Sequence, residues 1–332
     1  MRATQSKTVF HNIVKMRELG ILFVLIAMIF IFSVTSSVFF TVNNFLNITR
    51  QISLLGIMAM GMTMVIAVGG VDLSVGAVYA ICSTSAAALM TRGQIPILPS
   101  CLIALLIGLL FGVLNGVLIG YCKIMPFITT MGTMNVARGL ALIIARGKII
   151  SLDKDPVPDP EHLDAFFCFG GGSIGGVPTL AVILIVIVIF SWLFFHKSLT
   201  GFRLRAVGGS IEAAGASGIN VKKTILIPYI LTSGLCAVAA LANFSFMHTV
   251  QGTMGEGQEL QVLAAAYIGG ASPIGGGGTI MGTLIGALIM GVLQNGLVLL
   301  GVNTFVQQIV IGMLVIVAVM IDVYRNEKRK SR

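Results

Sequence analysis

The residues of this chain that could carry chemistry are few, and their spacing fits no common catalytic or metal site. The segment Gly171-Gly-Ser-Ile-Gly175 matches the G-x-S-x-G pattern of a nucleophilic serine, but it lies in a glycine-rich stretch instead of a turn between a strand and a helix. The 4 histidines lack H-E-x-x-H spacing, and the 5 cysteines lack zinc-ligand spacing. We therefore expect no enzyme activity, no catalytic residue, no metal and no cofactor.

Energy-coupling chemistry is also missing from the sequence. The phosphate-binding pattern G-x-x-x-x-G-K-[ST] does not occur, since the one Gly-Lys pair, Gly147-Lys148, is followed by Ile149. The long apolar runs contain almost no carboxylates, which a carrier driven by protons or sodium would need. If this chain transports a solute, we expect ATP hydrolysis to take place in a separate ATPase subunit.

Composition indicates a membrane protein built from helices. Hydrophobic residues make up 56% of the chain and charged residues 10%, which is more apolar surface than a soluble domain of 332 residues could bury. The net charge of +9 does not indicate nucleic-acid binding, because the basic residues gather at the ends of apolar runs. The predicted fold class is an all-α polytopic bundle that forms one transmembrane domain, residues 1–332.

Apolar runs long enough to cross a bilayer predict about ten transmembrane helices, with room for broken or re-entrant ones. The predicted spans are 19–41, 52–68, 71–90, 98–120, 127–145, 177–195, 224–247, 260–274, 279–300 and 305–323. Ten crossings place three basic segments on one side, which the positive-inside rule makes cytoplasmic: the tail 1–18, the loop 196–223 and the tail 324–332. The acidic, glycine-rich loop 146–176 then lies outside.

Glycines recur at every fourth position in two of the predicted spans. The two runs are Gly108, Gly112, Gly116 and Gly120, and Gly278, Gly282 and Gly286. Small residues let helix backbones approach closely where lipid provides no hydrophobic drive for association. The pattern favours a tightly packed helix face over a pore-lining one.

Two of the predicted spans, 52–68 and 260–274, are short and are followed by glycine-rich breaks. The breaks are Gly69-Gly-Val-Asp-Leu-Ser-Val-Gly76 and Gly269-Gly-Ala-Ser-Pro-Ile-Gly-Gly-Gly-Gly278. Irregular backbone at membrane depth is tolerated only inside protein or beside a water-filled cavity, so both breaks are candidates for a translocation path or its gates. Tight cytoplasmic turns that join full spans are an equally good interpretation.

A few polar residues at membrane depth are candidates for a functional role. Asp72 should open a helix, either as a simple cap of its first turn or as a gate or substrate contact. Arg138 must face a structural partner or a wet cavity. Glu256 and Glu259 flank an outer loop and are expected to be solvated. The candidate path or gate residues are Asp72, Ser74, Thr129, Thr130, Asn135, Arg138, Glu259 and Ser272.

The basic loop 196–223 contains the signature of one short helix. Ser210 can cap it, Glu212 falls in its first turn, Ala213 and Ala214 leave a flat face, and Gly218 can end it. A helix of about two turns is stable only when it is docked. It either lies on lipid headgroups, attracted by the flanking bases, or inserts into a cytoplasmic motor protein.

Four motifs in order resemble the permease subunits of bacterial ABC sugar importers of the ribose permease type. They are the stretch 200–220 around the short helix, the break Gly69–Gly76, Pro126-Phe-Ile-Thr-Thr-Met-Gly132 with Arg138-Gly139, and Ala264-Ala-Ala-Tyr-Ile-Gly-Gly270 with the glycines after it. The similarity covers residues 44–322. Two positions depart from the family pattern: Gly215 stands where relatives usually carry a larger residue, and Pro273 interrupts a stretch that more commonly reads Thr-Ser-Leu.

The resemblance implies a multi-pass permease of the bacterial inner membrane. It implies a second permease subunit, identical or homologous, two cytoplasmic ATP-binding subunits and a periplasmic sugar-binding protein as partners. Ser210, Glu212, Ala213, Ala214 and Gly218 would form the coupling helix that docks into the ATPase. The expected function is alternating-access import of a monosaccharide or similar polyol, whose hydroxyl groups need only hydrogen bonds from residues such as Asn135, Thr129 and Thr130. The alternative is an ion-coupled secondary carrier of a small polar solute.

Overall fold

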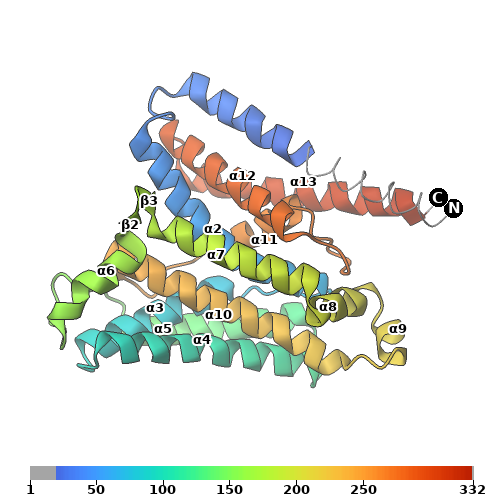
Figure 1. Cartoon of the computed structure of the whole chain (residues 1–332), viewed down its shortest axis with the longest axis horizontal. Helices are drawn as coiled ribbons and strands as arrows, with labels where there is room; N and C mark the ends of the chain where they lie inside the picture. The colour runs from blue at the N-terminus through green and yellow to red at the C-terminus, as the bar shows by residue number, and fades with distance from the viewer. Residues whose placement is uncertain (1–19, 331–332) are drawn as a thin grey trace.

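The computed structural model describes residues 20–330 and consists almost entirely of helices that run side by side along one direction (Figure 1). The predicted N-terminal tail 1–18 and the last two residues of the basic tail 324–332 lie outside the described residues. The helical fold class is confirmed for the described chain.

Six helices of the described chain are long and apolar enough to cross a membrane. They are α2 (Val42–Ala67), α4 (Ile97–Gly120), α5 (Pro126–Ala145), α7 (Thr179–Trp192) continued by the π-helical turn η2 (Leu193–Lys197), α10 (Val221–Met247) and α12 (Ile280–Leu299). Three further apolar helices are shorter: Gly20–Thr35, α3 (Val75–Thr91) and the apolar part, Thr304–Met320, of α13 (Thr304–Lys330). α11 (Gln258–Ile268) has 11 residues and is too short to cross a bilayer alone.

The predicted spans overlap these helices, but the start of the short span 52–68 was wrong. The span belongs to α2, which has 26 residues and begins at Val42, where the Thr41 hydroxyl caps it by accepting from the amide of Asn44 at 3.3 Å. The predicted start fell too late because the first turns of α2 carry polar residues. The short span 260–274 is confirmed as short, since α11 ends at Ile268. The number of crossings and the sidedness of the termini stay predictions.

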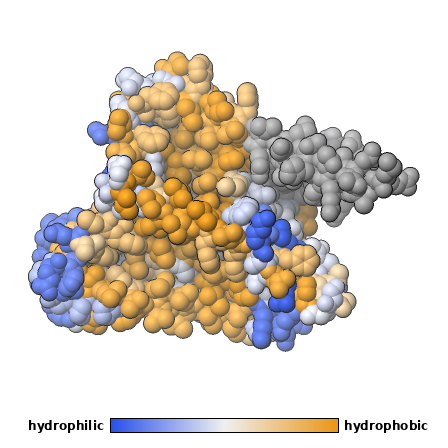
Figure 2. All heavy atoms as spheres, viewed as in Figure 1, coloured by the Kyte–Doolittle hydropathy of each residue, from blue (hydrophilic) through white to orange (hydrophobic). Residues whose placement is uncertain are grey.

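The remaining elements gather at the two ends of the bundle (Figure 1). One end, called the α6 end, carries η1 (Pro160–His162), α6 (Leu163–Gly171), the β1–β4 pair (Ile150–Ser151 with Thr249–Val250) and the β2–β3 hairpin (Ser173–Ile174 with Val177–Pro178). The other, the α9 end, carries α8 (Leu199–Gly209) and α9 (Ile211–Ala216). Hydrophilic residues cluster at both ends and leave an apolar belt between them (Figure 2), as expected for a membrane-spanning bundle.

The repeated glycines make close contacts between helices. A Cβ added at Gly112 would lie 2.6 Å from Cα of Ile230, and one added at Gly116 would lie 2.9 Å from Cα of Leu226, so α4 packs its glycine face directly on the backbone of α10. In the same way, a Cβ at Gly282 or Gly286 of α12 would overlap backbone carbonyls of α11 and the residue that follows it. The predicted packing role is confirmed for α4 and for Gly282 and Gly286, whereas Gly278 lies in the break before α12.

Helix α2 lies at the centre of the described bundle. Every residue from Leu55 to Ala67 is buried, and α2 packs against α7, α10, α11 and α12. Its last residue, Ala67, leads into the irregular segment 68–74, which ends where α3 begins. The most buried helix of the described bundle therefore leads directly into one of the two glycine-rich breaks that the sequence singled out.

Candidate functional site

The short helix α9 forms the tip of the α9 end (Figure 1). Ser210 caps it: the hydroxyl accepts from the amide of Ala213 at 3.1 Å and donates to the Glu212 carboxylate at 3.0 Å. Gly218 ends it with a φ of +79°, a conformation that favours glycine. The start and the end predicted for this helix are both confirmed.

The outer side of α9 is open to solvent. Ile211, Glu212, Ala213 and Gly215 are exposed, whereas Ala214 is buried against the chain itself. Ala214 therefore packs the inner side of α9 against the rest of the chain. Of the predicted alanine pair, only Ala213 lies on the exposed side, where a partner protein could bind. The backbone amide of Glu212 and the Ser210 hydroxyl hold the pKa of the Glu212 carboxyl below its usual value, so this position is anionic at neutral pH.

Asp72 lies in the segment 68–74 and is completely buried, but it does not cap α3. The helix starts at Val75 with Ser74 in the cap position, and the Asp72 carboxylate accepts from the Ser74 amide at 2.9 Å and the Ser74 hydroxyl at 2.5 Å. The capping role expected for Asp72 was wrong, because Ser74 stands between it and the first helical turn. Its other oxygen, Oδ2, is buried and has no hydrogen-bond partner among residues 20–330.

A chain of buried side chains connects Asp72 to two other helices. The Asn115 amide of α4 donates to the Ser74 hydroxyl at 2.9 Å, and the Thr133 hydroxyl of α5 donates to the Asn115 carbonyl oxygen at 2.6 Å. All four residues are buried. The sequence argument missed Asn115 and Thr133; the available signal was an amide between Gly112 and Gly116, on a helix face predicted to be packed.

The other candidates on α5 lie on different sides of that helix. Thr129 and Thr130 are buried; the Thr130 hydroxyl donates to the Pro126 carbonyl at 2.9 Å, and the Thr129 hydroxyl has no partner. Asn135 is exposed and donates to the Met131 carbonyl at 2.9 Å. Of the three residues predicted to contact a sugar, only Asn135 lies on a free surface of this chain.

That free surface runs along much of α5. Phe127, Ile128, Met131, Gly132, Asn135 and Val136 are all exposed, and a Cβ added at Gly132 or Gly139 would meet nothing within 4 Å. An exposed asparagine in a helix long enough to span a membrane is expected to face protein or water instead of lipid.

Arg138 holds the irregular segment before α11, a contact that the sequence argument missed. The chain between β4 and α11, residues 251–257, has no helix or strand, and the Arg138 guanidinium donates to its carbonyls at Gly252 (2.8 Å) and Met254 (2.6 Å). Carbonyls outside regular structure must find donors at membrane depth. Arg138 therefore has a structural partner, and that partner is the backbone of the segment 251–257. Three glycines within six residues, Gly252, Gly255 and Gly257, were the available signal.

The segment 251–257 meets the first break at the start of α3. A Cβ added at Gly76 would overlap the Gly255 carbonyl oxygen and lie 2.8 Å from a Glu259 carboxylate oxygen. Both glutamates were expected to be solvated. Glu256 is exposed, but Glu259 is half-buried because of this contact. The first turns of α3 and α11 therefore converge, with Glu259 between them.

The second glycine-rich break lies at the α9 end. It connects α11 to α12 and contains Ser272, whose carbonyl accepts from the Gly275 amide at 2.9 Å. The structure thus does not bring all eight predicted path residues together. Asp72, Ser74, Thr130, Arg138 and Glu259 lie around the starts of α3 and α11. Thr129 is buried, Asn135 lies on the exposed side of α5, and Ser272 lies in the break after α11.

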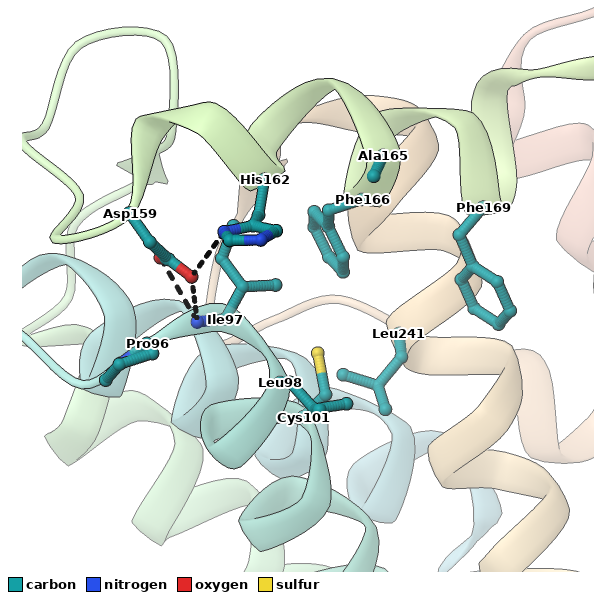
Figure 3. Close-up of a pocket in the computed structure, with 10 residues that line it drawn as sticks. All are labelled: Pro96, Ile97, Leu98, Cys101, Asp159, His162, Ala165, Phe166, Phe169 and Leu241. Carbon is teal, nitrogen blue, oxygen red and sulfur yellow. Dashed lines mark hydrogen bonds and ion pairs between the residues drawn. The ribbon is translucent and has the colours of Figure 1, made fainter.

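A pocket of about 540 Å³ lies at the α6 end and contains none of the predicted site residues (Figure 3). It is lined by Pro96, Ile97, Leu98, Cys101, Asp159, His162, Ala165, Phe166, Phe169 and Leu241. Asp159 fastens η1 to the start of α4 by accepting from the Ile97 amide at 3.2 Å. The wall is largely apolar, so it offers few partners for sugar hydroxyl groups. Within residues 20–330, no three His, Cys, Asp or Glu side chains are grouped to hold a metal ion.

Comparison with known proteins gives a consistent result. Residues 44–319 match the family described as branched-chain amino acid transport system / permease component. The chain is 40% identical over 307 residues to the ribose import permease protein RbsC of Bacillus subtilis, covering 92% of this chain and 93% of that one. It is 38% identical to RbsC of Escherichia coli K12 (91% and 92% covered) and 34% identical to the D-allose transport system permease protein AlsC of the same strain (91% and 90% covered).

No solved structure matches the chain significantly. The family match covers far more than half of the sequence, and the similarity to the curated relatives extends over nearly the whole length of both partners. The helices long and apolar enough to span a membrane agree with a multi-pass protein. The chain belongs to the family of ABC transporter permease components that includes the ribose import permeases.

Proposed function

We propose that this chain is the substrate-conducting subunit of an ATP-driven importer for a monosaccharide or similar polyol in the bacterial inner membrane. Two copies, or this chain and a homologue, would enclose the path. Two cytoplasmic ATP-binding subunits would drive it, and a periplasmic sugar-binding protein would deliver the substrate. The relatives named for ribose and D-allose support a sugar as cargo.

The observation that carries the proposal is the geometry of α9. A helix of six residues is too short to be stable alone, yet here it is capped at both ends and held on the bundle by buried Ala214. It presents Ile211, Glu212 and Ala213 outward, among exposed bases such as Lys222 and Lys223. A preformed, exposed helix of this kind suits insertion into a groove of a partner. Lipid headgroups alone would not require an anionic tip.

The free surface of α5 is the proposed wall of the path. Two copies that face each other through α5 would place two Asn135 side chains and two glycine-lined surfaces around a shared space. Asn135 can both donate to and accept from a sugar hydroxyl. Thr253 and Glu256, exposed on the segment that Arg138 holds, would supply further polar groups. In alternating access, docking and release at α9 would shift which end of this space is open.

The test is substitution at the tip of α9. In the complex with its ATPase, Glu212→Arg should abolish co-purification of the ATPase or uncouple ATP hydrolysis from uptake, because it reverses the one acidic charge of the docking surface. Glu161→Arg makes the same charge change on an exposed glutamate at the α6 end and should leave co-purification unchanged. If Glu212→Arg keeps both the ATPase and coupled uptake, α9 is not the docking helix.

The secondary-carrier alternative makes the opposite predictions. It requires uptake of radiolabelled D-ribose into ATP-depleted vesicles when a proton or sodium gradient is imposed, and it requires that Glu212→Arg has no effect. Uptake that depends on ATP and on the ATPase subunit, with no response to either gradient, supports the importer.

A further inference from the structure

Three stretches of backbone meet at the α9 end without side chains between them. The amide of Gly276 donates to the carbonyl oxygen of Ala67 at 2.9 Å. A Cβ added at Gly208 would overlap that same oxygen and lie 2.6 Å from the Gly276 nitrogen. A Cβ added at Gly275 would lie 2.7 Å from the Gly208 carbonyl oxygen. We call Ala67, Gly208, Gly275 and Gly276 the glycine junction.

Each of the three backbone segments in the junction belongs to a different part of the fold. Gly208 is in the last turn of α8, two residues before the Ser210 cap of α9. Ala67 ends α2 and leads into the segment 68–74 with Asp72. Gly275 and Gly276 belong to the break between α11 and α12. The junction therefore joins the α9 tip directly to both glycine-rich breaks.

Direct backbone contact transmits displacement well. Long side chains can absorb a small shift by changing rotamer, whereas close-packed backbone atoms cannot, and packed interiors pass on strain. The first break leads into α3, and the second follows α11. The starts of these two helices lie side by side, because a Cβ added at Gly76 would lie 2.8 Å from a Glu259 carboxylate oxygen. A movement of α8 would consequently reach both short helices at once.

We propose that Gly208 is a positioning residue that couples movement of α9 to both breaks, and through them to α3 and α11. The inference rests on the proposed function, in which an ATPase docks on α9. It goes further by identifying the contact that carries the movement into the bundle and by requiring that the α8 end and the break 269–279 move together.

The chain offers a matched pair of substitutions. Gly208→Ala forces a methyl group into the Ala67 carbonyl, whereas Gly209→Ala, on the neighbouring residue, adds a methyl group that meets nothing within 4 Å. Both changes raise helix propensity by a similar amount. A difference between the two variants therefore reports the junction and not the local stability of α8.

The measurement follows distances between spin labels in the complex with the ATPase, without nucleotide and with ATP and vanadate. Labels at Ile274 and Lys123, both exposed, report the distance between the second break and the α4–α5 turn. Labels at Ile274 and at Arg203, an exposed residue of α8 outside the docking face of α9, span the junction itself. The background replaces the accessible cysteines Cys101, Cys122 and Cys168 by serine. We expect the 274–123 distance to change by about 2–5 Å on adding nucleotide, while the 203–274 distance stays constant.

Gly208→Ala should abolish the nucleotide-dependent change in the 274–123 distance while the ATPase stays bound, and Gly209→Ala should preserve the change. An unaltered response in Gly208→Ala overturns the proposal. So does a change in the 203–274 distance in the chain with both glycines intact, which tests the idea even if Gly208→Ala does not fold. Failure of that unaltered chain to retain an ATPase would instead contradict the proposed function, and this inference with it.

Discussion

Asn44 of α2 and Asn295 of α12 exchange two hydrogen bonds inside the bundle. The Asn44 amide donates to the Asn295 carbonyl oxygen at 3.0 Å, and the Asn295 amide donates to the Asn44 carbonyl oxygen at 2.7 Å. Both side chains are buried. Towards the other end of the same two helices, the hydroxyls of Thr63 and Thr283 lie 2.6 Å apart. Polar pairs thus fasten α2 to α12 at two levels.

Asn44→Leu should destabilise the fold by about 1–2 kcal/mol, because Asn295 is left buried without its partner. The double variant Asn44→Leu/Asn295→Leu should lose less than the sum of the two single variants, since no orphan amide remains. Denaturation in detergent, analysed as a double-mutant cycle, measures this coupling. Asn43→Leu, at an exposed position of α2, should change stability little. Additive single effects would contradict the pairing.

Arg138→Met should release the segment 251–257, because the Gly252 and Met254 carbonyls lose their donor at membrane depth. The expected result is at least about a tenfold faster reaction of a cysteine placed at half-buried Met254 with a water-soluble maleimide, in a background without accessible native cysteines. Arg146→Met, at an exposed site just past α5, is the control. An unchanged labelling rate in Arg138→Met would show that Arg138 does not hold the segment.

The variants Ser74→Ala and Ser85→Ala each remove a buried serine hydroxyl, and the two hydroxyls differ in their hydrogen bonds. The Ser74 hydroxyl donates to Asp72 and accepts from Asn115, whereas the Ser85 hydroxyl is buried with no partner. Removing the first should cost about 1–3 kcal/mol, because it leaves the Asn115 amide without its acceptor; removing the second should cost almost nothing or stabilise slightly. Thermal unfolding of both variants in the same detergent measures the two losses of stability. Equal effects would mean that the Asp72–Thr133 chain does not stabilise the fold.

Gly112→Ala should weaken the contact between α4 and α10, since its methyl group would lie 2.6 Å from Cα of Ile230. We expect a loss of about 1–3 kcal/mol from overpacking, despite the better helix propensity of alanine. Gly132→Ala, where the added methyl group meets nothing within 4 Å in this chain, should be neutral or stabilising in the monomer. A monomer in which both substitutions behave alike would argue against the glycine face as the packing surface.

Residue patterns within short stretches determined the fold class and the bounds of the short helix α9. The apolar runs, the repeated glycines of α4 and α12, and the Ser210 to Gly218 cap signals all predicted what the structure has, because each depends on neighbours within one or two helical turns. The absence of a phosphate-binding motif likewise needed no tertiary information. Similarity of ordered motifs then indicated the transporter family.

The tertiary structure alone decided which polar residues find partners. The length criterion started the span 52–68 too late because the asparagines before it are unusual in a membrane helix, whereas Asn44 is satisfied by a residue 251 positions away. Asp72 was expected to cap a helix, yet Ser74 and Asn115 set its environment. The meeting of Ala67, Gly208 and Gly276 has no local signal either. Helix assignment rests on nearby residues, while hydrogen-bond satisfaction and backbone contact at membrane depth depend on segments that only folding brings together.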